Sequence, residues 1–258
     1  MFKAQPASCP LCFIRYKVKP VITLSTFEQF YLTIKGNRWY WLFSIFCRVV
    51  LAFAFIIAGM VKILGERFAS GLSEIHPMGA YLTALHQTGY YYTFIGIAQV
   101  VAAVLLLIPR TVTMGALIYF PIIVNIWLLS FAVRFEGSFV TAPLMVLANL
   151  YLLVWNYDRL RYILPISKFS DLGIVQKPEK YNTKFPLLFF TGVVLIVMGT
   201  IAFARFGYEA MPRNSLADCK KQFENAQNGA AGLEFCECIH TAGQPLDTCL
   251  KAFEDSGN

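Results

Sequence analysis

Residues 40–64 read YWLFSIFCRVVLAFAFIIAGMVKIL, an apolar run that holds only two charged side chains. A helix of roughly 20 mostly apolar residues is long enough to cross the hydrocarbon core of a bilayer, which is about 30 Å thick. Four further runs have a similar length and character, and they lie at residues 90–108, 112–133, 139–157 and 185–206. Pro121 and Pro143 lie within the third and fourth of these five runs and are expected to kink them. The sequence therefore predicts an all-α membrane protein with five membrane-spanning helices.

The composition of the whole chain agrees with this class of protein. Hydrophobic residues make up 57% of the 258 positions and charged residues 14%, whereas soluble domains have about 45–50% and about 25%. The mean hydropathy is +0.56. These values exclude a disordered chain, a collagen-like fibre and a coiled coil, and they argue against an ordinary cytosolic enzyme.

Lysine and arginine are unevenly shared among the flanks of the spans. Six of them fall in residues 1–39, six fall in residues 158–184, and Arg110 lies between the second and third spans. The other two loops hold only Arg67 and Arg134. Because cytoplasmic loops carry the excess of positive charge, the N-terminus is predicted in the cytoplasm and the C-terminus in the periplasm of a bacterial inner membrane. Topology thereby explains the net charge of +7 without a nucleic-acid partner.

These features divide the chain into five parts. They are a basic cytoplasmic arm (1–39), a four-helix membrane bundle (40–160), a cytoplasmic linker (161–184), a fifth transmembrane helix (185–206) and a Cys-rich helical domain in the periplasm (207–258).

The loop at residues 65–89 is rich in aromatic and aliphatic side chains, which predicts a helix lying on the outer surface of the membrane. Its Glu74, His76 and His86 could bind a metal or relay protons, but isolated histidines at an interface are more typical of a surface helix. No metal site is therefore predicted.

Four cysteines lie in the predicted periplasmic tail, at Cys219, Cys236, Cys238 and Cys249. Four cysteines in a short exported domain indicate two disulfides, and three pairings are open. Residues two apart on a helix face roughly opposite sides, so Cys236 and Cys238 are each expected to pair with a distant partner. The alternative is a redox-active C-x-C, which would make these two residues catalytic. Cys9 and Cys12 form a C-x-x-C in the N-terminal arm, where no other cysteine or histidine would complete a zinc site, so an incidental reduced pair is expected.

The tail also carries helix signals. A helix capped by Asn214 or Ser215 is expected to run through Gln227 and to end at Asn228-Gly229. Gln244-Pro245 is expected to precede a second helix that runs to about Phe253. Their apolar side chains would form a small core, made of Phe223, Leu233, Phe235, Ile239, Leu246, Leu250 and Phe253.

Four polar side chains lie well inside the first four spans, namely Arg48, Gln99, Asn125 and Asn149. Counting along each span places them at similar depth, and polar groups at that depth usually face the interior of a bundle. They are therefore predicted to converge in one ligand-binding site. No Asp or Glu occurs in any span to pair with Arg48. Arg48 then either bonds backbone carbonyls and amides as a clasp or meets an exogenous group, such as a quinone carbonyl or a lipid phosphate.

Short motifs in the first three spans resemble the DoxX family of small bacterial membrane proteins over roughly residues 40–160. They are Arg48 with Gly59-Met60-Val61-Lys62, Gly96-Ile97-Ala98-Gln99-Val100-Val101, the run LLLIPR at residues 105–110, and Gly115-Ala116-Leu117. The resemblance implies a four-helix core and a link to quinone-dependent sulfur oxidation and thiol redox complexes, usually as a non-catalytic subunit. Many members have Glu where Gln99 stands, so an intramembrane Arg–Glu pair is not expected here. The fifth span and the Cys-rich tail extend beyond that core.

The leading functional hypothesis is a non-enzymatic subunit or scaffold of a bacterial inner-membrane complex, embedded in the lipid bilayer. Its tail would be the docking module for other membrane or periplasmic proteins. The alternative is an oxidoreductase subunit that links periplasmic thiols at Cys236 and Cys238 to a quinone near Arg48. A small-molecule transporter ranks last, because the spans lack acids for ion coupling and signs of an inverted repeat.

Overall fold

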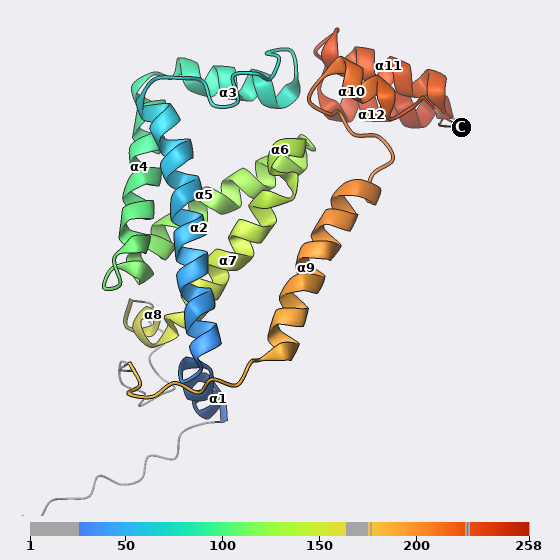
Figure 1. The fold of residues 1–258 in the computed structure, drawn as a ribbon. Coiled ribbons are helices and arrows are strands. Elements are labelled where there is room, and N and C mark those ends of the chain that lie inside the picture. The colour runs from blue at the N-terminus through green and yellow to red at the C-terminus, as the bar shows by residue number, and fades with distance from the viewer. Residues whose placement is uncertain (1–25, 164–174, 176, 225, 227, 258) are drawn as a thin grey trace, which may run out of the picture.

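A computed structural model describes residues 26–163, 175, 177–224, 226 and 228–257 of the chain. Within these ranges it contains helices and no strand, which confirms the predicted all-α class. Five helical segments are long and apolar enough to cross a membrane (Figure 1). The helices are α1 (Thr26–Lys35), α2 (Arg38–Ile63), α3 (Pro77–Gln87), α4 (Tyr90–Leu107), α5 (Val112–Ala132), α6 (Glu136–Phe139), α7 (Thr141–Trp155), α8 (Tyr157–Ile163), α9 (Leu187–Phe206), α10 (Leu216–Lys221), α11 (Gly229–His240) and α12 (Leu246–Gly257).

Helices α2, α4, α5 and α7 pack into one bundle around a shared apolar core. The backbones of α2 and α4 approach closely because Gly59 and Gly96 face each other. A Cβ built on either glycine would lie 2.7 Å from the carbonyl oxygen of the other. Deeper in the core, the rings of Phe55 and Tyr119 stack with their centroids 3.5 Å apart. The four-helix bundle predicted from the apolar runs is thus present.

The two prolines for which kinks are predicted occupy different places in their helices. Pro121 lies inside α5, which continues on both sides of it. Pro143 is the third residue of α7, in the first turn, where a backbone N–H has no partner within the helix anyway. The fourth predicted span is instead interrupted at Val140, between the short α6 and α7. That break directly follows Phe139, whose carbonyl is the one that Pro143, four residues later, cannot bond. The kinks at Pro121 and Pro143 stay predictions.

The fifth apolar helix, α9, stands beside the bundle rather than inside it (Figure 1). None of its residues is buried. Aromatic contacts hold it near its two ends, where Phe189 meets Phe43 and Phe203 meets Phe139. Its start is fixed by backbone pairing between Asn182 and the Gly36–Arg38 turn. Most of the surface of α9 is thus left for lipid.

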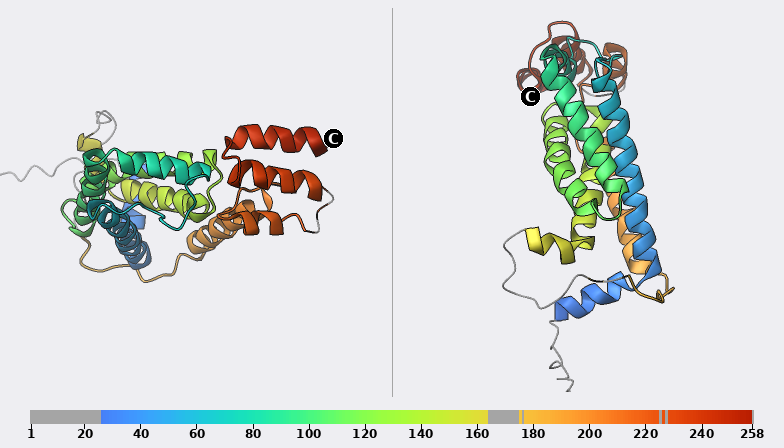
Figure 2. Two further views of the ribbon diagram at one scale, coloured as in Figure 1. Left: turned by 90° about the horizontal axis from the view of Figure 1, so that it is seen from above. Right: turned by 90° about the vertical axis from the view of Figure 1, so that its left-hand side faces the viewer.

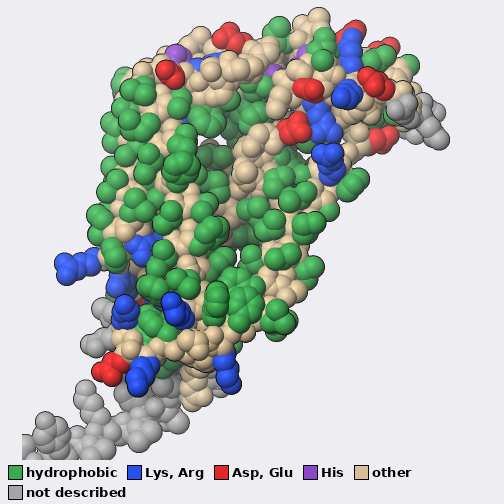
Figure 3. Space-filling view, viewed as in Figure 1, with side chains coloured by type: hydrophobic (Ala, Val, Ile, Leu, Met, Phe, Trp, Pro, Cys, Tyr) green, Lys and Arg blue, Asp and Glu red, His purple; other side chains and the backbone are tan. Residues whose placement is uncertain are grey.

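The two ends of the bundle differ in what covers them. At one end, called here the α1 end, α1 lies across the foot of α2 and α8 lies nearby (Figure 2). At the other, called the α3 end, lie α3 and the C-terminal domain. Hydrophobic side chains cover the face between them, and charged side chains gather toward the ends (Figure 3). Helix α1 was not predicted and lies inside the segment interpreted as a basic arm.

The C-terminal domain is a small unit of α10, α11 and α12, called here the stapled domain. Two disulfides join its helices, Cys219–Cys236 and Cys238–Cys249. Ser215 caps α10, as expected, but α10 ends at Lys221 and Asn228 precedes α11 instead of ending a helix. The glycine after Asn228 thus begins a helix. Five of the seven predicted core residues are buried, whereas Leu250 packs at the edge and Leu233 is 44% exposed.

Candidate functional site

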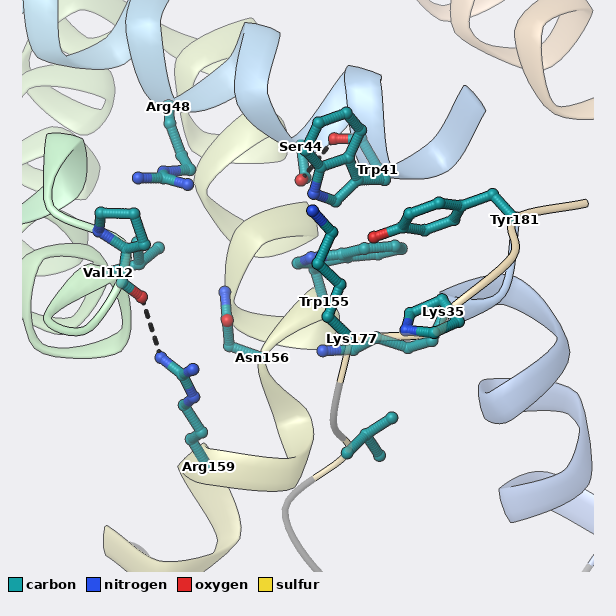
Figure 4. A pocket seen from close by; sticks show the side chains of 13 residues that line it. Lys35, Trp41, Ser44, Arg48, Val112, Trp155, Asn156, Arg159, Lys177 and Tyr181 are labelled. Atoms are coloured by element: carbon teal, nitrogen blue, oxygen red, sulfur yellow. Dashed lines mark hydrogen bonds between the residues drawn. The ribbon is translucent and has the colours of Figure 1, made fainter. Parts of the chain in front are cut away.

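A pocket of about 240 Å³ lies at the α1 end, among α2, α8, the α4–α5 turn and the segment that precedes α9 (Figure 4). Two groups of side chains give it its character. The cationic ones are Lys35, Arg48, Arg159 and Lys177. The aromatic ones are Trp41, Trp155 and Tyr181. Such a combination of positive charge and aromatic walls is typical of the boundary between a membrane and water.

The pocket exists because α2 extends past the α4–α5 hairpin. Arg48 is ten residues beyond the first residue of α2, yet it lies level with the last turn of α4. Its Nε donates to the Leu106 carbonyl at 2.8 Å, and its Nη2 donates to the Leu107 carbonyl at 2.7 Å. Arg48 is therefore not near the middle of the bundle, as counting along α2 alone had suggested. Its two hydrogen bonds connect α2 to the end of α4, as in the interpretation of Arg48 as a structural clasp, and its guanidinium borders the pocket.

Arg159 holds the same turn from the opposite side. Its Nη1 donates to the Pro109 carbonyl at 3.0 Å, and α8 supplies its backbone (Figure 4). Arg48 and Arg159 lie close enough to repel each other electrostatically. Lys177 approaches from the segment before α9, with its Nζ 5.5 Å from the ring centroid of Trp41. Three separate parts of the chain thus bring positive charge to one cavity.

The fourth cation, Lys35, has an anionic partner. Its Nζ lies 3.2 Å from Oδ1 of Asp158, which is 1% exposed and also accepts from the Tyr31 hydroxyl at 2.8 Å and from the Val175 N–H at 3.1 Å. Burial lowers the pKa of Lys35, and the nearby Asp158 carboxylate opposes that change. Burial, followed by the charge of Asp158, raises the pKa of Tyr31. The Asp158 carboxylate of α8 thus binds side chains of α1 and the backbone of the segment before α9, and it connects these three parts of the chain.

The four polar residues predicted to converge do not share one site. Gln99 and Asn149 are buried, and each has a side-chain oxygen without a hydrogen-bond partner among the described residues. Asn149 donates to the Ala116 carbonyl at 3.0 Å. Asn125 is exposed on α5, and Arg48 lies at the α1 end. The prediction was wrong because depth along a helix does not fix which face of the helix a residue occupies.

The C-x-C of the tail is divided between two bridges. Cys236 pairs with Cys219 and Cys238 pairs with Cys249, so the two cysteines are not partners of each other. The side chains of Cys219, Cys236 and Cys249 are completely buried. Cys47 is a free, buried cysteine in the bundle core. Cys9 and Cys12 lie outside the described residues.

The stapled domain contacts the α3 end through polar groups that the sequence analysis did not single out. Arg134 donates from Nη1 to the Ala210 carbonyl at 2.8 Å, and its guanidinium lies 4.1 Å from the Tyr208 ring centroid. Arg213 forms an ion pair with Glu136 at 3.0 Å. Arg134 carried one signal, since it is a lone cation in a short turn that joins two spans. These contacts fix the stapled domain to the corner between α5 and α6.

His76 lies at the same junction. It is fully buried, and its Nδ1 accepts the Met78 N–H at 3.1 Å, which caps α3. The pKa of His76 is lowered to about 4, chiefly by burial and then by His240, whose ring centroid is 5.5 Å away. His86 is engaged elsewhere, with its Nε2 2.9 Å from the Gly65 carbonyl. In the described part of the chain, no group of three or more His, Cys, Asp or Glu side chains is placed to hold a metal ion.

A comparison with known proteins finds a relative in Bacillus subtilis (strain 168), described as "Uncharacterized protein YwoB". The two chains are 36% identical over 121 residues, which make up 45% of this chain and 77% of the relative. No family model and no solved structure matches the chain. More than half of this chain therefore lies outside the matched region.

Proposed function

The chain belongs to the same family as the Bacillus subtilis protein YwoB, and from this premise we propose that it is a non-enzymatic scaffold subunit of a bacterial inner-membrane complex. The bundle, which we propose to be DoxX-like, anchors the protein in the cytoplasmic membrane. The stapled domain is the docking module for a membrane or periplasmic partner protein. The α1 end faces the cytoplasm and the α3 end the periplasm, since lysines and arginines gather at the α1 end.

The division of the C-x-C between two bridges, with three of the four cysteines fully buried and Cys238 partly buried, is the observation that carries this proposal. A thiol pair that exchanges electrons needs an accessible sulfur, because exchange proceeds by attack of a thiolate on a disulfide sulfur. Cys236 is fully buried and bonded to Cys219. Both bridges connect different helices of a domain whose core is small, as expected for staples. The bridges therefore favour a structural role over redox exchange.

The separation of the two ends also argues against electron transfer from tail thiols to a quinone near Arg48. Arg48 bonds the last turn of α4, whereas the stapled domain lies at the opposite end of the bundle. Helix α4 alone has 18 residues, a length of about 27 Å at 1.5 Å per residue. Electrons could not pass directly over that distance, and an intermediate carrier would be needed.

The two hypotheses differ in what a trapping variant would capture. In a Cys249→Ser variant of the full chain, the partly exposed Cys238 loses its partner and becomes a free thiol. This thiol can attack the disulfide of a redox partner, release one of the partner's sulfurs as a thiol and remain bonded to the other as a mixed disulfide. The scaffold proposal expects no mixed disulfide beyond the background of a Cys238→Ser/Cys249→Ser control in non-reducing electrophoresis. It also expects wild-type bridges that stay oxidised in a mildly reducing thiol buffer. A specific mixed disulfide, together with a labile wild-type bridge, would establish the oxidoreductase instead.

The orientation is tested separately with reporters fused after Asn258. Alkaline phosphatase, which is active only outside the cytoplasm, should be active there, and green fluorescent protein exported through the same route should be dark. The reverse pair of results would place the stapled domain in the cytoplasm and remove the proposed docking role in the periplasm.

A further inference from the structure

The pocket at the α1 end holds more positive charge than the described residues neutralise. Lys35 is paired with Asp158. Arg48, Arg159 and Lys177 form no ion pair within the described ranges, and no carboxylate is among the described residues that line the pocket. Three cations around one cavity repel each other, and an anion bound between them would relieve that repulsion.

Hydrogen-bond donors in the pocket remain available for such an anion. Each arginine uses part of its guanidinium on backbone carbonyls, Arg48 through Nε and Nη2, and Arg159 through Nη1. The other terminal nitrogen of each guanidinium, and the Lys177 ammonium, have no hydrogen-bond acceptor within the described part of the chain. The carbonyl bonds hold the two arginines in place, so the remaining donors are preorganised.

The size and position of the pocket limit what the anion is. Its volume of about 240 Å³ is below the roughly 300–1,000 Å³ of pockets for drug-sized ligands, so it suits a compact group. It lies at the end of the α4–α5 hairpin, and its wall contains Trp41 and Trp155, a residue type enriched where membrane proteins meet the lipid head groups. Guanidinium groups match the geometry of phosphate oxygens, and anionic lipids attract basic segments near the membrane surface.

We propose that this pocket binds a phosphate group, presented by an anionic phospholipid or another phosphate-bearing amphiphile at the membrane surface. A neutral quinone carbonyl would accept one or two hydrogen bonds and leave three cations without a counter-charge. A phosphate accepts several hydrogen bonds and supplies negative charge. Arg159 and Lys177, two of the six cations counted for topology in residues 158–184, are thereby assigned to ligand binding.

The test uses the full chain in uncharged detergent with two lipids that carry the same acyl chains, phosphatidylglycerol and diacylglycerol. Native mass spectrometry should detect a saturable phosphatidylglycerol adduct and no comparable adduct of diacylglycerol. Arg159→Gln and Lys177→Gln should each weaken binding by about tenfold, the effect of losing a charge-assisted hydrogen bond. The matched control is Arg110→Gln, because Arg110 is an exposed cation on the same turn and does not line the pocket. Arg48 is left unchanged because it clasps α4.

Competition with inorganic phosphate identifies the source of the group. Displacement of the lipid by millimolar phosphate would show that the phosphate alone is recognised, whereas resistance would show that the acyl chains contribute. Both results support the site, provided that the pocket variants, with unchanged melting temperatures, bind more weakly than Arg110→Gln. Equal loss in Arg110→Gln, or equal binding of diacylglycerol, would overturn the proposal in favour of diffuse electrostatics or non-specific lipid adsorption.

Discussion

The imidazole rings of His76 and His240 lie 5.5 Å apart, and one belongs to the loop before α3 while the other belongs to the stapled domain. His240 Nε2 is 2.6 Å from the Pro212 carbonyl, and Nε2 of His76 has no hydrogen-bond partner of standard geometry in the described residues. The junction between the bundle and the stapled domain therefore contains a buried imidazole that must stay neutral.

Acidification is expected to loosen this junction. The pKa of His76 is about 4 when it is buried there, against 6.5 in water, because burial and then His240 lower it more than the backbone of Arg213 raises it. Because the pKa of His76 is lower in the docked state, protonation favours the undocked state. The contribution of His76 to docking is therefore fully present above pH 6.5 and is lost progressively as the pH falls from 6.5 to about 4. At pH 5 the loss is about 2 kcal/mol. Amide hydrogen exchange at residues 207–213 should therefore be faster at pH 5 than at pH 7.5, after correction for intrinsic rates.

The control is His76→Gln, since glutamine can still accept the Met78 N–H but does not titrate. If the variant shows the same acid-induced increase in exchange as the wild type, another group is responsible and this account of His76 is wrong.

The ion pair between Arg213 and Glu136 is expected to contribute to docking by about 0.5–1 kcal/mol, because both side chains are partly exposed. Glu136→Arg should therefore raise amide exchange at the link before α10 by a few fold. The charge-swapped double variant, Glu136→Arg with Arg213→Glu, should restore protection. The Lys220–Glu237 pair is an ion pair of 2.8 Å inside the stapled domain, so swapping it should leave the junction unchanged. Failure of the junction swap to restore protection would contradict the contact.

Removal of either disulfide is expected to destabilise the stapled domain and leave the bundle folded. The bridged cysteines are 17 and 11 residues apart in sequence, and closing loops of this length stabilises a domain by about 3 kcal/mol. Paired serine variants, Cys219→Ser/Cys236→Ser and Cys238→Ser/Cys249→Ser, should become sensitive to protease within residues 207–258. A thermal transition of the membrane helices that shifts by the same amount would show that the two units unfold together.

The fold was largely predictable because its determinants are local. A run such as residues 40–64 must be a membrane helix whatever surrounds it, since no other structure satisfies its backbone in lipid. The spacing of Cys236 and Cys238 similarly excluded a bond between neighbours on a helix. The site was not predictable by the same means. Arg48, Arg159 and Lys177 meet because α2 is longer than α4 and because the segment before α9 returns to the foot of α2.

The polar residues of the spans show the same limit. Asn125 and Asn149 both lie near the centre of a predicted span, so the sequence gives no reason to place one inside the bundle and not the other. In the structure, Asn125 is exposed and Asn149 is buried. Burial depends on the rotation of each helix about its axis, which packing against neighbours decides. The near-uniform hydrophobicity of α5 and α7 gives no strong signal of that rotation. In contrast, Gly59 and Gly96 mark a real contact between helices, which can be tested directly.

Gly59→Ala and Gly96→Ala are each expected to destabilise the bundle by about 1–3 kcal/mol, the usual effect of overpacking a tight core. A Cβ on Gly59 would lie 2.7 Å from the Gly96 carbonyl oxygen, and one on Gly96 would lie 2.7 Å from the Gly59 carbonyl oxygen, so α2 and α4 must move apart in either variant. Because both methyl groups widen the same gap, the double variant should cost less than the sum of the two single variants. The control is Gly192→Ala on α9, where a Cβ meets no atom within 4 Å. Thermal unfolding in detergent measures all four variants. A loss in Gly192→Ala equal to that in Gly59→Ala would mean that the close approach of α2 and α4 does not limit the stability of the bundle.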